Sequence, residues 1–478
     1  MRLLSGSGLL LALGAAIAVP ASHARAQEQG IQADPAEGLP QPEARPLAID
    51  FTDDPVLALA DATADTEAFR TIVVAALEES PTGREARALE EVADARLSEA
   101  RGAYMPTIDL GVTGFTTLER NFTNDPSNFL ERSRPRERVD FNLNYAHTLW
   151  DFGAIDASVR SATARLRAAG YDREARTGEV AGDVTSAWTQ VFAFQSLERL
   201  LEGYLAAQDG LAAAVETRIE RGVSAEGDRA RVASLKAQAM VQLAQITRRR
   251  ASAEARFRQL SGTQAPDGLL RPPVLDATRI SQEFASLAAE TAPQVKSAEA
   301  VADAREADAD AAEAQRLPRL SARIDSARYG FTEPNRKDFD TRATLDLTWR
   351  IFGGGVWQRA RAAGAEADAA DAVADRIREE AIRDAEIAWS DVQALETQLA
   401  ALEDAYKASR QSRDIVVARF GALRGSLFDV ADAQNVYLDA ASAYIRALTE
   451  LDQARYILLL RTGRLLDMLG LEQGAAEQ

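Results

Sequence analysis

The sequence predicts a mostly helical protein with a membrane β-barrel, built as two tandem structural repeats. Three observations lead to this fold class. The 65 residues from Ala154 to Arg218 follow a helical pattern that no proline interrupts. Four shorter segments alternate apolar and polar residues as strands do. The order helix, strand, strand, helix occurs twice, at a spacing too long for a solenoid unit, which indicates a duplicated half-molecule.

The internal repeat is visible as matched residues. The displacement is 212 before the hairpins and 200 after them, so the second hairpin is shorter by 12 residues. The matches are Pro81 and Pro106 with Pro293 and Pro318, and Phe152-Gly153 with Phe352-Gly353. Length changes of this kind belong in loops.

Composition excludes several classes of function. The net charge of −18 argues against nucleic acid as a partner, because its binding needs clustered Lys and Arg. The absence of cysteine excludes disulfides, thiol catalysis, cysteine-ligated metals and a lipidated N-terminal cysteine. Gly353-Gly354-Gly355 lacks the Lys-Ser/Thr sequel of a phosphate-binding loop, and a lone His147 is more typical of a structural side chain than of a metal ligand. No enzyme activity and no cofactor are expected.

The N-terminal region has the pattern of an export signal. Residues 1–26 contain Arg2, an apolar run and the small-x-small sequence Ala24-Arg25-Ala26, so the mature chain is expected to begin at Gln27. Residues 27–65 form a disordered or extended lead. No later segment has the ~18 apolar residues of a membrane-spanning helix, so any membrane crossing must be made by strands.

Two hairpins, 107–151 and 319–351, supply the strands. Each has an apolar and aromatic face opposite a polar one, and its helix-proximal end carries aromatic residues typical of a membrane interface: Trp150, Phe152, Trp349 and Phe352. A sheet of a soluble protein would show a similar alternation. In lipid, however, four strands cannot close and open edges are not tolerated, so the chain is expected to oligomerise. A dimer, a trimer and a larger ring all fit the strands alone.

The helices carry seams for packing against neighbours. In the first repeat the seam residues follow three- and four-residue steps or their sum: Val191, Phe194, Leu197, Leu201, Tyr204, Leu211, Val215 and Ile219. Near the C-terminus large residues recur every seven positions, interleaved with alanines: Val430, Tyr437, Tyr444, Leu451, Leu458 and Leu465. A two-stranded coiled coil and a wider helical tube both fit this seam.

Gly and Ser punctuate the helical pattern at Arg221–Ser224 and at Leu423–Ser426, so each repeat contains a helical hairpin. The expected organisation is a first repeat at 66–261, a linker or equatorial segment at 262–290, a second repeat at 291–471 and a frayed tail at 472–478.

The chain resembles a known family from about Thr66 to Leu471. The resemblance rests on the duplicated order of elements, on the matched Pro and Phe-Gly pairs, and on the stretch Gly425–Gln434. The chain resembles the TolC-type outer-membrane factors of Gram-negative bacteria. The resemblance implies a homotrimer whose chains pool four strands each into a 12-stranded barrel in outer-membrane lipid, continued by a periplasmic α-helical coiled-coil barrel. It also implies a passive duct that a periplasmic adaptor and an inner-membrane ABC or RND transporter recruit.

The resemblance also indicates which residues surround the periplasmic entrance. Asp429 and Asp432, with Asp228 in the first repeat, match acidic positions that form rings in the family; the competing interpretation is a solvated or helix-capping aspartate. Phe420 stands where many members have a gating Tyr, and it cannot donate a hydrogen bond. The turn residues expected to contact the adaptor or bridge helices are Arg424, Gly425, Arg221 and Gly222.

The expected cargo follows from short stretches that look like the branch serving type I protein secretion: Gly425–Val430, Gly463–Leu466 and Gly222–Ser224. A multidrug efflux channel of the RND type is the alternative. A secreted coiled-coil structural protein is the remote one, because it leaves the four alternating segments without a role.

Overall fold

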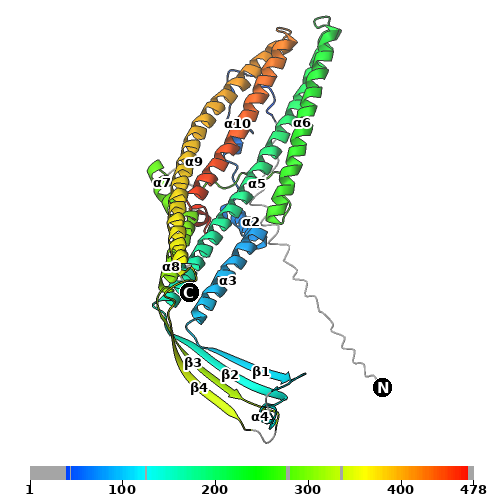
Figure 1. Ribbon diagram of the computed structural model, residues 1–478. Coiled ribbons are helices and arrows are strands. Elements are labelled where there is room, and N and C mark those ends of the chain that lie inside the picture. The colour runs from blue at the N-terminus through cyan, green and yellow to red at the C-terminus, as the bar shows by residue number, and fades with distance from the viewer. Residues whose placement is uncertain (1–38, 44, 124–125, 276–279, 334–336, 472–478) are drawn as a thin grey trace, which may run out of the picture.

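The computed structural model describes residues 39–43, 45–123, 126–275, 280–333 and 337–471. The chain is elongated, with a four-stranded sheet at one end and the turns of two helical hairpins at the other (Figure 1). The expected signal sequence at 1–26 and the expected frayed tail at 472–478 lie outside the described residues.

The sheet is antiparallel, in the order β1 (Thr107–Thr116), β2 (Glu137–Trp150), β3 (Arg319–Arg328) and β4 (Phe339–Thr348). β4 therefore ends before Trp349, which the alternation had included in a strand. Among the described residues of the single chain, no strand pairs with the outer edge of β1 or of β4. An open edge leaves backbone groups without partners, so the sheet is an incomplete unit.

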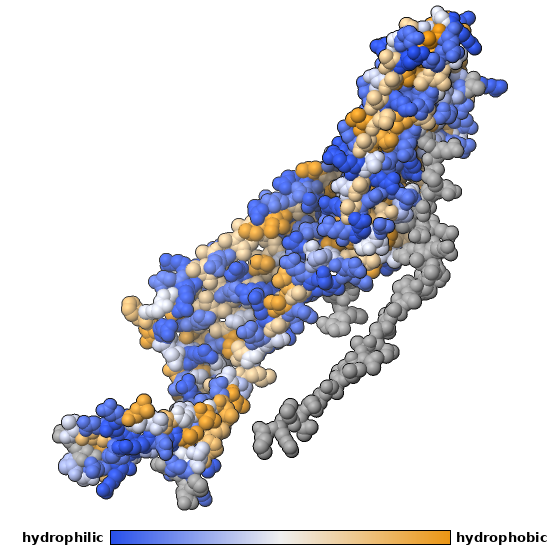
Figure 2. All heavy atoms as spheres, turned by 90° about the vertical axis from the view of Figure 1, so that its right-hand side faces the viewer, coloured by the Kyte–Doolittle hydropathy of each residue, from blue (hydrophilic) through white to orange (hydrophobic). Residues whose placement is uncertain are grey.

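The two faces of the sheet differ in polarity. Large apolar side chains are exposed on one face: Ile108, Leu110, Val112, Leu345 and Leu347. Next to the helices this apolar surface is visible in Figure 2. The other face carries a polar row across the strands, in which Asp109 lies opposite Asn144, Asn144 opposite Asp325, and Asp325 opposite Arg342. Exposed apolar side chains on a sheet face need a non-aqueous neighbour.

The helices confirm the tandem repeat. The first repeat contains α3 (Pro81–Gly102), α5 (Ala154–Glu220) and α6 (Glu226–Ser261), and the second contains α8 (Pro293–Ala314), α9 (Val356–Gly421) and α10 (Leu427–Arg461). Pro81 and Pro293 occupy the first turn of their helices, where a missing N–H costs nothing. The 67 residues of α5 span about 100 Å.

Shorter elements connect these helices: η1 (Leu57–Ala60), α2 (Thr66–Glu79), α4 (Phe129–Ser133), α7 (Gln282–Glu290) and α11 (Leu465–Met468). None of the helices in the described ranges contains an apolar stretch that could cross a lipid bilayer.

The heptad seam near the C-terminus is buried. From Val430 to Leu458 each large seam residue is at most 2% exposed. α10 packs against both α9 and α5, so the seam serves more than one neighbour. Leu465 is also buried, but it belongs to α11 because the helix has already ended at Arg461.

A pair of tryptophans anchors the linker between the repeats. The Trp188 indole donates to the carbonyl of Leu270, and the Trp389 indole donates to the carbonyl of Ile280, both over 2.8 Å. The Trp188 ring lies in the core, with its centroid 5.0 Å from that of Phe69. Each repeat thus uses the same residue type at a matched place to hold one side of the linker.

The described part of the N-terminal lead lies against the helices and contains turns and the short helix η1. Leu39 and Val56 are buried against the helices. Asp54 forms an ion pair with Arg410 of α9 and accepts hydrogen bonds from the Tyr406 hydroxyl over 2.9 and 3.0 Å. These buried polar contacts hold the lead against α9.

Candidate channel entrance at the helical tips

The two hairpin turns lie at the end of the molecule opposite the sheet (Figure 1). The α5–α6 turn contains Gly222 at φ 74°, and the α9–α10 turn contains Gly425 at φ 94°. Both values fall in the left-handed region that favours glycine. Leu423 also has a positive φ of 63°, a strained conformation for a branched residue.

Asp429 lies in the first turn of α10, where it caps the helix. The Asp429 backbone N–H donates to the Ser426 hydroxyl, and the Ser426 backbone N–H donates to the Asp429 carboxylate, each over 3.2 Å. This reciprocal pair is a capping box. The hydrogen bonds from Ser426 hold the pKa of Asp429 below its ordinary value. The carboxylate is therefore ionised at neutral pH and serves the helix end.

A hollow of about 320 Å³ between α9 and α10 brings two of the expected acidic residues together. Asp429 and Asp432 line it, together with Arg419 from α9. Asp228 lies apart, on α6, where its carboxylate accepts a hydrogen bond from the Ala225 N–H over 3.2 Å. Ala225 has no side-chain oxygen, so only half of the capping box exists there.

Phe420 is buried at the end of α9, where it contacts the other hairpin. It is 3% exposed, and the Arg218 guanidinium of α5 lies 4.2 Å from the centroid of its ring. Arg218 also donates to the Phe420 carbonyl over 3.0 Å and to the Ser224 hydroxyl over 3.1 Å. Phe420 has no hydroxyl, and the hydrogen-bond donor at this contact is Arg218 of the first repeat.

Arg221 and Arg424 are exposed at the two turns, as are Gly222 and Gly425. Neither arginine has a carboxylate within 4.0 Å in the described part of the chain. Their contact with an adaptor stays a prediction.

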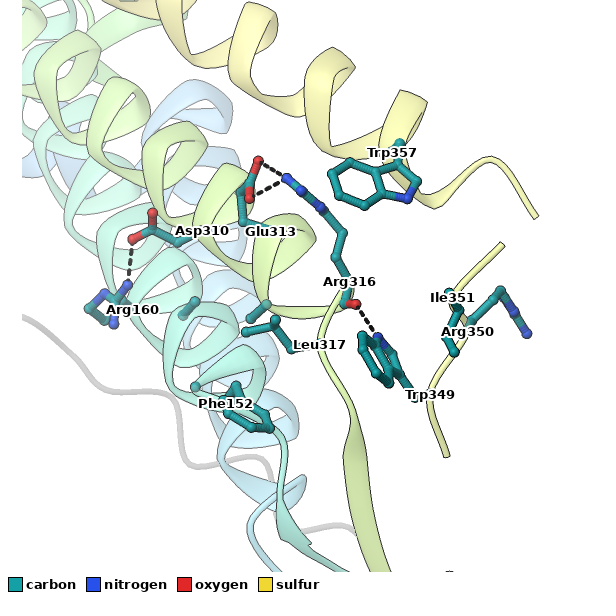
Figure 3. A pocket seen from close by; sticks show the side chains of 13 residues that line it. Phe152, Arg160, Asp310, Glu313, Arg316, Leu317, Trp349, Arg350, Ile351 and Trp357 are labelled. Atoms are coloured by element: carbon teal, nitrogen blue, oxygen red, sulfur yellow. Dashed lines mark hydrogen bonds and ion pairs between the residues drawn. The ribbon is translucent and has the colours of Figure 1, made fainter. Parts of the chain in front are cut away.

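The four aromatic residues that the sequence predicts at a membrane interface lie at the helix-proximal end of the sheet. Trp150 and Phe152 make an edge-to-face pair with centroids 5.9 Å apart. In the second repeat the Trp349 indole donates to the Arg316 carbonyl over 3.1 Å (Figure 3). Phe352 is 96% exposed. All four side chains are exposed in the single chain.

Sequence reasoning missed Arg218, which joins the two hairpin tips. A signal existed: Arg218 lies between Val215 and Ile219 of the apolar seam, and it is only 8% exposed. A cation on a buried stripe requires a partner. The Asp54–Arg410 pair was also missed, and no sequence pattern links residues that are 356 positions apart.

Comparison with known proteins identifies the family. The model of the outer membrane efflux protein family matches residues 72–263 and 284–464, which is most of the chain. The chain therefore belongs to the outer membrane efflux protein family. No curated protein matches the sequence significantly.

Solved structures share the fold. The outer-membrane channel OprN is 21% identical, with 91% of this chain and 96% of OprN covered and a TM-score of 0.72. The Campylobacter jejuni outer-membrane channel CmeC is 16% identical, with 91% and 95% covered and a TM-score of 0.73. The Vibrio cholerae outer-membrane protein VceC is 17% identical, with 85% and 97% covered and a TM-score of 0.71. At these identities the likeness establishes the fold alone.

Family membership confirms the coarse functional assignment. The protein is an outer-membrane efflux channel of a tripartite system and not an enzyme. Channels of this family are homotrimers that work with periplasmic adaptors and inner-membrane transporters.

Proposed function

We propose that three copies of this chain form a passive duct that conducts protein cargo from an inner-membrane ABC transporter and its adaptor to the exterior, as in type I secretion. The observation that supports the duct is the pair of unpaired sheet edges, β1 and β4, on a chain whose long hairpins extend from the same sheet. Three copies close 12 strands into a barrel without edges. The matched stretch Gly425–Val430 at the tip supports the secretion branch.

Efflux of small molecules through an RND-type transporter is the second candidate. The family description, which names efflux, favours it. One experiment separates the two cargoes: the gene is deleted in the source organism, and secreted proteins and intracellular retention of dyes and antibiotics are measured in parallel. Loss of one or a few large extracellular proteins with unchanged drug tolerance is expected. Drug hypersensitivity with an intact set of secreted proteins would instead establish efflux.

We further propose that Asp429 and Asp432 form a carboxylate ring at the entrance of the trimer. Their shared hollow and the low pKa of Asp429 support this role, since ionised groups tripled by symmetry attract cations. The double variant Asp429→Asn/Asp432→Asn should reduce the preference of the channel for cations in planar bilayers. Asp439→Asn, an exposed change on the same helix, is the control. An unchanged ion preference in the double variant would leave the aspartates as helix caps and surface charges.

Export of the chain is proposed to depend on residues 1–26, with cleavage after Ala26. N-terminal sequencing of protein purified from outer membranes should begin at Gln27. A start at residue 1 would show that the segment is retained.

A further inference from the structure

A cationic stretch interrupts an otherwise acidic chain. Residues 347–365 contain three arginines, Arg350, Arg359 and Arg361, and no Asp or Glu, although the whole protein has a net charge of −18. All three side chains are exposed. In the described ranges none of them lies within 4.0 Å of a carboxylate. Their charge is therefore available to an anion from outside the chain.

Two of these arginines converge on one turn between β4 and α9. Arg359 donates to the Gly354 carbonyl over 3.0 Å. The Arg350 side chain lies over the same glycine, because a Cβ added to Gly354 would lie 3.1 Å from the Arg350 Cδ and 3.3 Å from its Nη1. Both guanidinium groups thus lie beside Gly354, which has a φ of 68°.

Exposed apolar side chains surround these arginines. Trp349 is 55% exposed, Ile351 68%, Phe352 96% and Trp357 57%. We call the segment Trp349–Arg361 the arginine–aromatic turn. Ring and aliphatic groups of this size are rarely left in water next to one another, so the turn presents an apolar surface with a cationic rim.

Both indole rings contact Arg316, in the turn that follows α8. Trp349 is bonded to the Arg316 carbonyl, and the Arg316 guanidinium lies 3.5 Å from the centroid of the Trp357 ring. Arg316 itself is paired with Glu313 over 2.6 Å. Arg350 points away from this paired group (Figure 3). The structure therefore separates a neutralised arginine, which orients the rings, from an unneutralised one, which faces outward.

The first repeat is an internal comparison. At the displacement of 200, Asp151 corresponds to Ile351, and Trp150 to Arg350. The Asp151 carboxylate accepts hydrogen bonds from the N–H groups of Gly153 and Ile155 over 3.1 and 2.8 Å. The first repeat thus supplies its own anion at this turn. The second repeat has an apolar residue and an added cation at the matched positions.

From this charge and its apolar surroundings, we propose that the arginine–aromatic turn binds an anionic glycerophospholipid, with its phosphate between Arg350 and Arg359 and its glycerol and upper acyl chains against Trp349 and Ile351. Charge complementarity favours this occupant, because anionic lipids attract exposed arginines and indole rings favour the headgroup level. A free phosphate ion would explain the arginines but leave the exposed apolar side chains without a partner. The proposal rests on the membrane location of the sheet that the family establishes, and it does not depend on the nature of the cargo.

Lipid titration of the purified, detergent-solubilised full-length protein tests this proposal. Native mass spectrometry would record retained lipid while phosphatidylglycerol or phosphatidylcholine is added. Each arginine near an anionic membrane surface is worth about a fivefold change in affinity, so two contribute roughly 25-fold. We expect the wild type to retain phosphatidylglycerol in preference to phosphatidylcholine by about that factor. The variant Arg350→Gln/Arg359→Gln should lose the preference.

Arg249→Gln is the matched control, because Arg249 is an exposed arginine on α6 without a carboxylate partner in the described ranges. It should behave as the wild type. The masses recorded in the same spectra show whether each variant keeps the oligomeric state of the wild type. If a variant fails to fold, the comparison of the two lipids on the wild type still tests the proposal.

Several results would overturn the proposal. Equal retention of the two lipids by the wild type would show that a second copy of the chain covers the turn, or that the turn does not distinguish anionic from zwitterionic lipids. Retention of the preference in the double variant would place the lipid site elsewhere. Displacement of phosphatidylglycerol by millimolar inorganic phosphate would identify a free-anion site. A protein that fails in secretion and efflux assays but keeps the lipid preference would refute the proposed cargo and leave this inference intact.

Discussion

Replacement of Asp452 by Asn should destabilise the protein strongly through the partner that it leaves behind. Asp452 of α10 and Arg271 of the linker form a two-bond pair, Nε to Oδ2 over 2.8 Å and Nη2 to Oδ1 over 2.6 Å. Their side chains are 3% and 2% exposed. The Arg271 backbone is also bonded to the lead, to Ala64 over 2.7 Å and to Ala62 over 3.0 Å. One arginine thus joins three separate segments of the chain.

The expected loss of folding stability follows from the burial of the two side chains. Asn keeps the size of Asp but removes its charge, so the Arg271 guanidinium remains buried without a counter-charge. Breaking a buried pair in this way costs about 3–5 kcal/mol. Removing both charges with Arg271→Met/Asp452→Leu should cost far less than the single change, because an apolar pair of similar volume often replaces a buried ion pair with little loss.

Guanidinium unfolding of the detergent-solubilised protein, followed by circular dichroism and by hydrogen exchange of residues 60–65, provides the assay. Asp439→Asn, an exposed change on the same helix, is the control and should shift stability by at most about 0.5 kcal/mol. The reasoning is refuted if Asp452→Asn costs no more than the control. It is equally refuted if the double variant is as unstable as the single one, because the cost would then not come from the stranded charge.

Three further changes test other contacts. Arg218→Met should speed amide exchange at the end of α9 by about tenfold, because it removes a charged hydrogen bond and a cation–π contact. Ser426→Ala should destabilise the start of α10 by about 1 kcal/mol through loss of its cap, as measured by amide exchange. The pKa of Asp429 is lower in the folded state than in the unfolded state, so its ionised carboxylate stabilises the folded protein at neutral pH. This stabilisation is lost as the pH falls below about 4. Asp54→Asn should expose the lead to proteases, since it leaves the buried Arg410 with only the longer 3.8 Å contact to the exposed Glu43 carboxylate.

Each of these three has a control near its own site. Arg221→Met removes an arginine close to Arg218 that forms no side-chain hydrogen bond or ion pair with the described residues. An equal effect of this control would show that Arg218 does not link the two hairpins. Ala225→Ser adds the missing cap oxygen to α6 and should stabilise that helix end by about the amount that Ser426→Ala removes. Asp50→Asn changes an exposed carboxylate in the lead, so cleavage comparable to that of Asp54→Asn would show that burial is not the cause.

Much of the fold could be predicted from the sequence, because the helical and strand periodicities extend over long segments and the two repeats show the same order of elements. The pattern from Ala154 to Arg218 nearly matches α5, and the two alternating hairpins became the four strands. The matched prolines Pro81 and Pro293 each lie at the first position of a helix. The strand expected to reach Ile351 ends at Thr348, because three glycines with positive φ follow and the chain leaves the sheet before them.

The candidate entrance was predicted less completely. The motif at Gly425–Gln434 contains Asp429 and Asp432, which lie three residues apart on α10 and line the hollow between α9 and α10. The contact between Arg218 and Phe420 joins helices from different repeats, so no local sequence pattern predicted it. Asp228, which the sequence assigned to the first repeat, lies at the start of α6 and does not line this hollow.

The sequence by itself determined the helices, the strands, the duplication and the family, because these depend on patterns within a few turns or on matched positions along the chain. Only the tertiary structure decided which partner each buried charge has. Asp54 with Arg410, Arg271 with Asp452, and Arg218 with Phe420 all join residues more than 180 positions apart. A buried charge requires a partner, but sequence periodicity does not specify which one, since the partner is fixed only when distant helices pack together.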